Sequence, residues 1–120
     1  MRVYLAGPMT GLPAWNFPAF DRAAAHGRSL GFDVISPADL DRDAGFAPDH
    51  DADINGDLLR AVVRRDLDAI LSADAIALLP GWENSKGATA ELGVARWLHL
   101  RVFDATTWEP YVHFRACSAW

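Results

Sequence analysis

Short apolar runs alternate along the chain with longer segments in which apolar residues recur every three or four positions. The short runs are rich in β-branched and aromatic residues, which predicts strands; they cover 2–6, 32–36, 74–79 and 101–105. The longer segments have helical periodicity; they cover 17–30, 58–71 and 88–99. Strands that alternate with helices predict an α/β fold, a three-layer, doubly wound parallel sheet of the flavodoxin or Rossmann-like type.

The first strand begins at the second residue and ends at Gly7-Pro8, which predicts a central strand followed by a loop at its carboxyl end. Asn16 is placed to cap the first helix, and Gly31 to end it. The helix over 58–71 has the strongest periodicity, with Arg64, Arg65, Asp66 and Asp68 on its predicted polar face.

Residues 38–57 are acidic and rich in turn formers, which predicts a solvated, mobile loop that covers the site. An EF-hand is excluded, because Phe46 and Ala52 stand where a calcium loop needs glycine and a bidentate glutamate. The aromatic tail over 106–120 is expected to add a short strand or to pack on a partner.

The chain has 120 residues, which predicts one domain over 1–120. Its formal net charge of −5 argues against binding to a nucleic acid polymer or to an anionic membrane. Cys117 is the single cysteine, so an internal disulfide and a cysteine metal cluster are excluded. The N-terminus lacks the pattern of a signal peptide or membrane span, and a cytoplasmic location is expected.

Candidate chemistry gathers after the buried run at 74–79. Ser85, Lys86 and Gly87 stand at the start of the last helix, where free backbone N–H groups and a hydroxyl can hold an anion, and Glu91 lies in its first turns. Neither a dinucleotide fingerprint nor a P-loop is present. Of the four histidines, His50 lies in the acidic segment, while His99 and His113 are expected on core-facing elements. We therefore expect no metal and no cofactor.

Three segments, in this order along the chain, together resemble the nucleoside 2-deoxyribosyltransferase-like superfamily, and in particular its small, mostly uncharacterised phage and bacterial members. They are YLAGPMTG at 4–11, RRDLDAILSADAIALLP at 64–80 and SKGATAELGVA at 85–95. Among characterised members, the spacing of Ser85, Gly87 and Glu91 is similar to that in the 2'-deoxynucleoside 5'-monophosphate N-glycosidases.

This resemblance implies cleavage of the N-glycosidic bond of a (deoxy)nucleoside 5'-monophosphate, with release of the free base. Glu91 stands at the position of the family's nucleophile, which forms a covalent deoxyribosyl-enzyme. Tyr4 is expected to orient that nucleophile, and Asp66 to contact the sugar or help protonate the departing base.

Binding roles follow from the same resemblance. Ser85 and the Gly87 amide are expected to hold the 5'-phosphate, and Lys86 to add a positive charge. Gly7 lies at the carboxyl end of the first strand, and Trp82 is a candidate to stack on a base. Small relatives form dimers, and together with five tryptophans this predicts a homodimer or higher homo-oligomer.

Each of these residues also has an ordinary explanation. Glu91 is compatible with a solvent residue favoured by the helix dipole, Tyr4 with a core aromatic, and Asp66 with an ion pair to Arg65 on the helix face. Glu83 offers a second carboxylate near the site. At the level of function, the alternatives are a nucleoside deoxyribosyltransferase and a nucleotide-binding or sensing module without catalysis.

Overall fold

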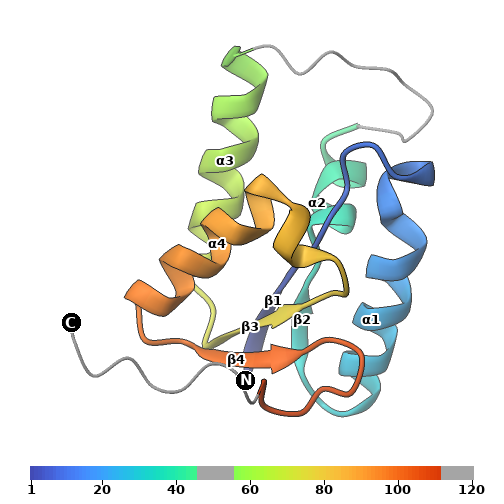
Figure 1. The fold of residues 1–120 in the computed structure, drawn as a ribbon, viewed down its shortest axis with the longest axis vertical. Coiled ribbons are helices and arrows are strands. Elements are labelled where there is room, and N and C mark those ends of the chain that lie inside the picture. Colours follow the sequence, from blue (N-terminus) through green and yellow to red (C-terminus); the bar gives the residue numbers. More distant parts are fainter. Residues whose placement is uncertain (46–55, 112–120) are drawn as a thin grey trace.

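The computed structural model describes residues 1–45 and 56–111, and its core is a four-stranded parallel sheet (Figure 1). The strand order is β2-β1-β3-β4, with neighbours parallel throughout. The strands are β1 (Arg2–Ala6), β2 (Asp33–Ile35), β3 (Ala75–Leu78) and β4 (Arg101–Asp104). The predicted α/β class and the central position of the first strand are both confirmed.

Helices cover both faces of this sheet, which makes the three layers (Figure 1). The α-helices are α1 (Phe17–Ser29), α2 (Pro37–Asp43), α3 (Gly56–Leu71) and α4 (Lys86–Trp97), and two short 3₁₀ turns are η1 (Pro13–Asn16) and η2 (Trp82–Asn84). α1 packs on one face, and α3 and α4 pack on the other. Successive side chains of a strand point to opposite faces, so Val3 and Leu5 face α1, whereas Tyr4 and Ala6 face α3 and α4.

The ends of α1 lie where the sequence places them, although one signal acts differently from the expectation. Gly31 follows the helix at φ 96°, and its amide donates to the Arg28 carbonyl, as expected of a glycine that ends a helix. Asn16 precedes the helix, but its side-chain amide donates to the Pro8 carbonyl instead of accepting from the first turn. Asn16 therefore ties the loop after β1 to α1.

The acidic segment over 38–57 was wrongly predicted as entirely loop, because residues 37–43 form α2. A helix of two turns is too short to show periodicity, and this one is joined to α1 by ion pairs and buries only Pro37 and Ala38 at its start. Residues 46–55 of the predicted loop lie outside the described residues.

α3 is the predicted helix, but much of it stands clear of the sheet (Figure 1). Ile70 is its only fully buried residue, whereas Leu59 and Val63 are 50% and 44% exposed. The apolar stripe of its N-terminal half therefore does not pack on strands. It lines an open cavity instead.

Two further expectations concern the C-terminal part. His99 is exposed, at φ 60° directly after α4, and not core-facing. In the tail, Pro110 forms an isolated antiparallel bridge with Phe103, while His113 and the rest of 112–120 lie outside the described residues. None of the described helices combines the length and apolarity that a membrane span requires.

Candidate active site

A cavity of about 740 Å³ opens at the carboxyl ends of the two central strands. The connection that follows β1 leads to β2 on one side of it, whereas β3 and then β4 lie on its other side. The strand order therefore reverses between β1 and β3. Ligands of open α/β sheets bind at such a reversal. The cavity walls come from β1, the loop after it, α2, α3 and the start of α4.

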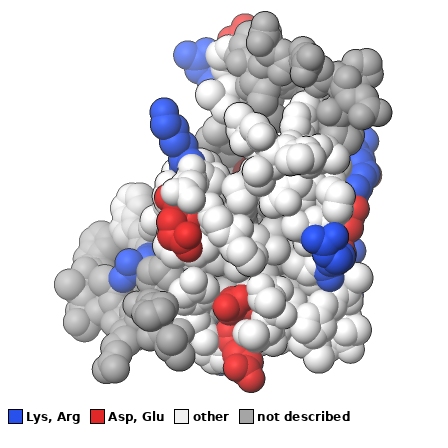
Figure 2. All heavy atoms as spheres, turned by 45° about the vertical axis from the view of Figure 1, so that its right-hand side comes forward, with Lys and Arg blue, Asp and Glu red and all other residues white. Residues whose placement is uncertain are grey.

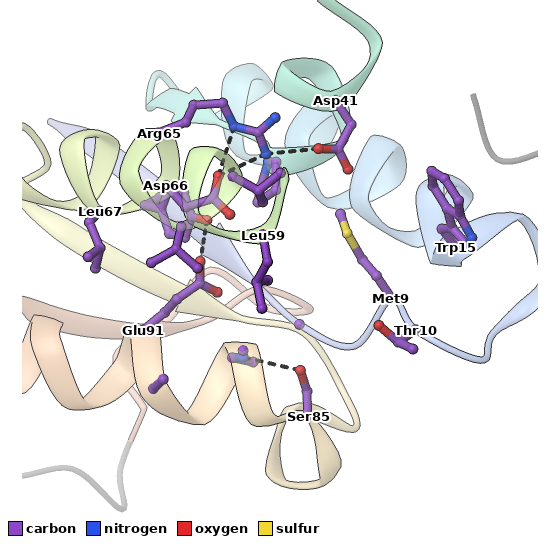
Figure 3. Close-up of a pocket in the computed structure, with 18 of the residues that line it drawn as sticks. Met9, Thr10, Trp15, Asp41, Leu59, Arg65, Asp66, Leu67, Ser85 and Glu91 are labelled. Carbon is purple, nitrogen blue, oxygen red and sulfur yellow. Dashed lines mark hydrogen bonds and ion pairs between the residues drawn. The ribbon is translucent and has the colours of Figure 1, made fainter. Parts of the chain in front are cut away.

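Tyr4 and Glu91 meet at the floor of this cavity. The Tyr4 hydroxyl donates to Oε2 of Glu91 at 2.5 Å, although the two residues are 87 positions apart. Tyr4 is fully buried in the centre of β1, and Glu91 lies on the second turn of α4, with its side chain turned toward α3 (Figure 3). Glu91 is therefore not the solvent-facing helix residue of the ordinary explanation.

Asp66 of α3 lies beside this pair and is bound by Arg65. The Arg65 guanidinium donates from Nε and from a terminal nitrogen to Oδ1 of Asp66, at 3.0 and 2.9 Å. The same terminal nitrogen donates to Oδ1 of Asp41 on α2 at 2.8 Å (Figure 3). The ion pair considered from the sequence exists. It lies in the cavity wall rather than on a solvent face, with side chains only 13–23% exposed.

Burial raises the pKa of both carboxyl groups. The pKa of Glu91 rises to about 8, chiefly because burial disfavours its charge, although the Tyr4 hydrogen bond and Arg65 favour the ionised form and partly oppose the rise. Burial also raises the pKa of Asp66, against the opposing effect of Arg65. The pKa of Tyr4 is raised well above its usual value by burial and by the two neighbouring carboxylates. At neutral pH the cavity floor therefore retains a proton.

At the start of α4, Ser85 and Gly87 line the cavity as predicted, whereas Lys86 does not. Ser85 caps the helix, since its hydroxyl oxygen accepts from the Ala88 amide at 3.1 Å. Gly87 takes an ordinary helical conformation, and a Cβ added there would meet nothing closer than Ser85 Oγ at 4.0 Å. Its lack of a side chain leaves room on the cavity side.

The remaining predicted residues divide between cavity and core. Gly7 lines the cavity, and a Cβ there would come within 2.7 Å of the Leu79 Cβ, so glycine is required by close packing and not by a positive φ. Trp82 does not line the cavity; it packs edge-on against Tyr111 beside the core. Glu83 is exposed and also outside the cavity, which leaves Glu91 as the carboxylate of this segment that enters the site.

The sequence interpretation missed two groups of residues in the cavity wall. Asp41 lies in the acidic segment that was predicted as a loop, and Arg65 was considered only on the polar helix face and as a partner of Asp66. An apolar wall also faces the carboxylates; it includes Met9, Trp15, Leu58, Leu59, Val62 and Val63. The sequence offered one signal for this wall, since α3 has more apolar residues than packing on the sheet requires. Among residues 1–45 and 56–111, no three His, Cys, Asp or Glu side chains are grouped to hold a metal ion.

Figure 2 shows one face of the molecule on which uncharged residues predominate and charged side chains stand apart from one another. Among the described residues, the acidic and basic side chains that line the cavity are Asp41, Asp66, Glu91 and Arg65. Arg65 binds two of the three carboxyl groups directly, those of Asp41 and Asp66. The cavity combines an apolar wall with a polar floor, which is the pattern of a small-molecule site.

Comparison with known proteins relates both the chain and its fold to earlier work. Residues 1–104 match the family described as "Domain of unknown function (DUF4406)". The structure is similar to that of a 2-deoxyribosyltransferase from the psychrotolerant bacterium Bacillus psychrosaccharolyticus, at a TM-score of 0.64 and 23% identity, covering 86% of this chain and 70% of that chain. A conserved protein from Enterococcus faecalis V583 gives a TM-score of 0.60 at 20% identity, covering 87% of this chain and 62% of that one. No curated protein matches the sequence.

These similarities confirm the predicted fold, since the structure has the α/β fold of a 2-deoxyribosyltransferase. At 20–23% identity they concern the fold alone. The roles of individual residues therefore depend on the geometry of this cavity.

Proposed function

This chain belongs to the DUF4406 family, and we propose that it cleaves the N-glycosidic bond of a deoxynucleoside 5'-monophosphate and releases the free base. The observation that carries the proposal is the Tyr4–Glu91 hydrogen bond on the floor of a cavity of about 740 Å³. Two carboxyl groups at one site, here Glu91 and Asp66, match the pair that most enzymes use to cleave glycosidic bonds. The shared fold with a 2-deoxyribosyltransferase supports this reaction class.

In the first step, Glu91 attacks C1' of the sugar, the C1'–O bond forms and the C1'–N bond breaks. The transition state resembles an oxocarbenium ion, which a carboxylate beside C1' stabilises and then captures as an ester. Tyr4 holds Glu91 in one orientation through its hydroxyl. Water then attacks C1' and releases the deoxyribose phosphate.

The departing base needs a proton, and the cavity floor holds one. Burial raises the pKa of both carboxyl groups, that of Glu91 to about 8, so the two groups together hold one proton at neutral pH. When that proton resides on Asp66, Glu91 is ionised and attacks C1' as a carboxylate, while Asp66 donates the proton to the base nitrogen, so no external acid is consumed. Hydrolysis of the ester by water returns one proton to the pair. The pair therefore works as a unit with one shared proton.

The start of α4 is the proposed seat of the 5'-phosphate. Ser85 and Gly87 precede Glu91 by six and four positions, which is about 6–9 Å along a helix axis and comparable to the span of a deoxyribose phosphate. The backbone N–H groups and positive dipole end of α4 favour an anion there. Lys86 is exposed just outside the cavity and contributes a more distant charge.

One observation favours a second candidate, deoxyribosyl transfer between uncharged nucleosides. Among residues 1–45 and 56–111, three carboxyl groups and one guanidinium line the cavity, and the guanidinium is already bound by two of the carboxyl groups. This balance disfavours a phosphate dianion. Both candidates share the Glu91 ester and differ in whether water or a second base resolves it.

The test is incubation with each common deoxynucleoside and its 5'-monophosphate, with and without a second free base, followed by chromatography of the bases. We expect base release from the monophosphates, and a quenched reaction should contain protein heavier by one deoxyribose phosphate. Exchange of bases on uncharged nucleosides would instead support transfer. Gly87→Ala, whose Cβ the fold accommodates, should weaken use of monophosphates more than of nucleosides.

Glu91→Gln should reduce base release by at least about 10³-fold, because the amide cannot form the ester. The matched control is Glu83→Gln, which changes an exposed carboxylate outside the cavity and should leave the rate unchanged. Full activity of Glu91→Gln would contradict the proposal, and so would nucleotide binding without any base release by the unmodified protein, which would favour the binding module.

A further inference from the structure

The residue before Asp66 has no role in the mechanism above, yet it lies in the cavity wall. Arg65 makes two bonds to a single oxygen of Asp66 and a third to Asp41 (Figure 3). Its neighbour Arg64 is exposed and lies outside the cavity. Two adjacent arginines on one helix thus have different environments, which points to a specific task for Arg65.

Both bonds from Arg65 end on Oδ1 of Asp66, so Oδ2 takes no part in them. The Asp66 carboxyl group is therefore anchored through one oxygen, and its other oxygen is not bound by Arg65. Arg65 is itself held from two elements, because Asp41 belongs to α2 and Asp66 to α3. The order of contact is Asp41, Arg65, Asp66, Tyr4 and Glu91.

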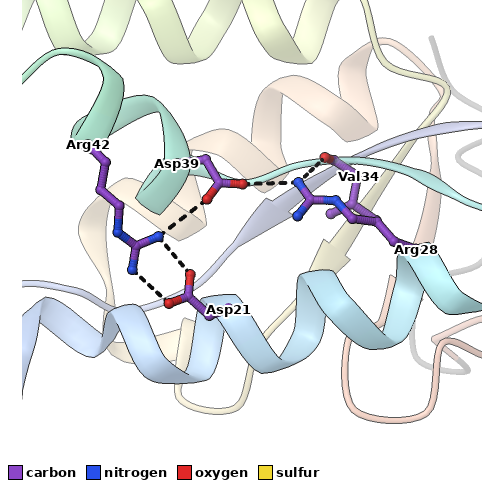
Figure 4. A network of polar contacts seen from close by, with 5 residues as sticks. All are labelled: Asp21, Arg28, Val34, Asp39 and Arg42. Atoms are coloured by element: carbon purple, nitrogen blue, oxygen red, sulfur yellow. Dashed lines mark hydrogen bonds and ion pairs between the residues drawn. The ribbon is translucent and has the colours of Figure 1, made fainter.

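α2 in turn is joined to α1 by a second set of ion pairs (Figure 4). Arg42 binds both oxygens of Asp21 at 2.9 and 2.6 Å and also reaches Asp39 at 3.3 Å. Arg28 of α1 binds Asp39 at 3.0 Å and the Val34 carbonyl at 2.9 Å. Asp41 therefore extends from a helix whose position is set independently of α3.

We propose that Arg65, anchored by Asp41 of α2, is a positioning residue that orients the Asp66 carboxyl group toward the reacting base and so couples α2 to the catalytic residues. The inference rests on the proposed function. It predicts that the geometry of the guanidinium matters and not its charge alone, because an ammonium cannot donate from two fixed nitrogens to one oxygen while also holding Asp41.

Four variants separate positioning from charge and from folding. Arg65→Met removes the three hydrogen bonds and the charge, whereas Arg65→Lys keeps the charge. Asp41→Asn weakens the anchor on α2, and Arg64→Gln is the matched control. We expect kcat to fall about 10- to 100-fold in Arg65→Met and nearly as far in Arg65→Lys, with KM within about two-fold. The kcat of Asp41→Asn should fall less, and the kcat of Arg64→Gln should equal that of the unmodified protein. A kcat of Arg65→Met or Arg65→Lys within two-fold of the unmodified protein, with folding intact by circular dichroism, overturns the proposal.

A second readout does not depend on turnover. The charged or titratable groups that face Glu91 are Tyr4 of β1 and Asp66 and Arg65 of α3, with Asp41 of α2 beyond Arg65. Carbon-13 NMR titration of the carboxyl groups should give a higher Glu91 pKa in Arg65→Met, because the substitution removes a positive charge that favours the ionised form, whereas Arg65→Lys should retain the pKa. If the unmodified protein released no base, the proposed function would be wrong. The titration would still test whether Arg65 acts on Asp66 and Glu91. Unchanged titration of both Asp66 and Glu91 in Arg65→Met would overturn the proposal.

Discussion

The two faces of the sheet are built from the same strands but differ in character. On the α1 face the core is built from aliphatic and aromatic side chains, and Phe32 stacks on Trp108 with ring centroids 5.1 Å apart. On the α3 and α4 face the floor contains a buried phenol that binds a carboxyl group. Because β1 alternates its side chains, neighbouring residues of one strand serve a packed core and a reactive cavity.

This difference concerns stability as well as position. Apolar burial against α1 favours folding, whereas a carboxyl group whose pKa is raised by burial opposes folding at any pH where the unfolded chain ionises it. The cavity side gains reactivity at a cost in stability that the α1 side offsets. Substitutions on the two sides should therefore separate stability from activity.

The largest stability effect is expected at Gly27 in α1. A Cβ at this position would come within 2.3 Å of the Trp108 ring, which is 4% exposed and held by the stacked Phe32. Gly27→Ala should lower the free energy of unfolding by about 3 kcal/mol, measured by urea titration, because the packed ring cannot move aside. Gly93→Ala on α4, where a Cβ meets nothing within 4 Å, is the control and should be neutral or stabilising by up to about 1 kcal/mol. A Gly27→Ala protein as stable as this control would show that the α1 face is loosely packed.

On the cavity side, Glu91→Gln should stabilise the protein in a pH-dependent way. Folding raises the pKa of Glu91 from 4.5 to about 8, so the folded state binds an extra proton between these values. The contribution of protonated Glu91 to the free energy of unfolding is fully present below pH 4.5 and is lost as the pH rises toward 8. Glutamine does not titrate, so the variant shows no such loss. The variant and the unmodified protein should therefore have about the same free energy of unfolding at pH 4, and the variant should be more stable by about 2 kcal/mol at pH 9. An advantage that is independent of pH would mean that Glu91 is not buried in its ionisable form.

The smallest effect is expected between α1 and α2. The Arg42–Asp21 pair is bidentate, but both side chains are more than 40% exposed. Asp21→Asn should cost about 0.5 kcal/mol of unfolding free energy at low salt and less in 1 M salt. Asp57→Asn, which changes a fully exposed pair with Arg60, should cost less still. A cost at Asp21 that salt leaves unchanged would indicate that the clamp acts through packing rather than charge.

Local patterns in the chain predicted most of the fold. The β-rich runs became the four strands within one or two residues at each end, and the periodic segments became α1, α3 and α4. Gly31 ended α1 as expected. These elements were predictable because the period of apolar residues depends on backbone geometry alone. α2 was not, because a short helix held by Arg42 and Arg28 has no periodic signal of its own.

The candidate site was predictable only in part. Family resemblance singled out Tyr4, Asp66, Ser85, Gly87 and Glu91, and all five line one cavity. It also singled out Lys86 and Trp82, which lie outside that cavity. Lys86 and Trp82 are close in sequence to residues that line the cavity. Closeness in sequence does not predict whether a side chain enters a cavity, because other elements form most of its wall.

By itself, the sequence determined the order of strands and helices and the residue types available at the carboxyl end of the sheet. Tertiary structure alone decided which of them meet. The parallel pairing of β1 with β3 brings Tyr4 to Glu91 across 87 positions, and the docking of α2 on α1 brings Asp41 to Arg65. Periodicity is a property of one segment, whereas these contacts depend on the relative placement of several segments, which only packing of the whole chain determines.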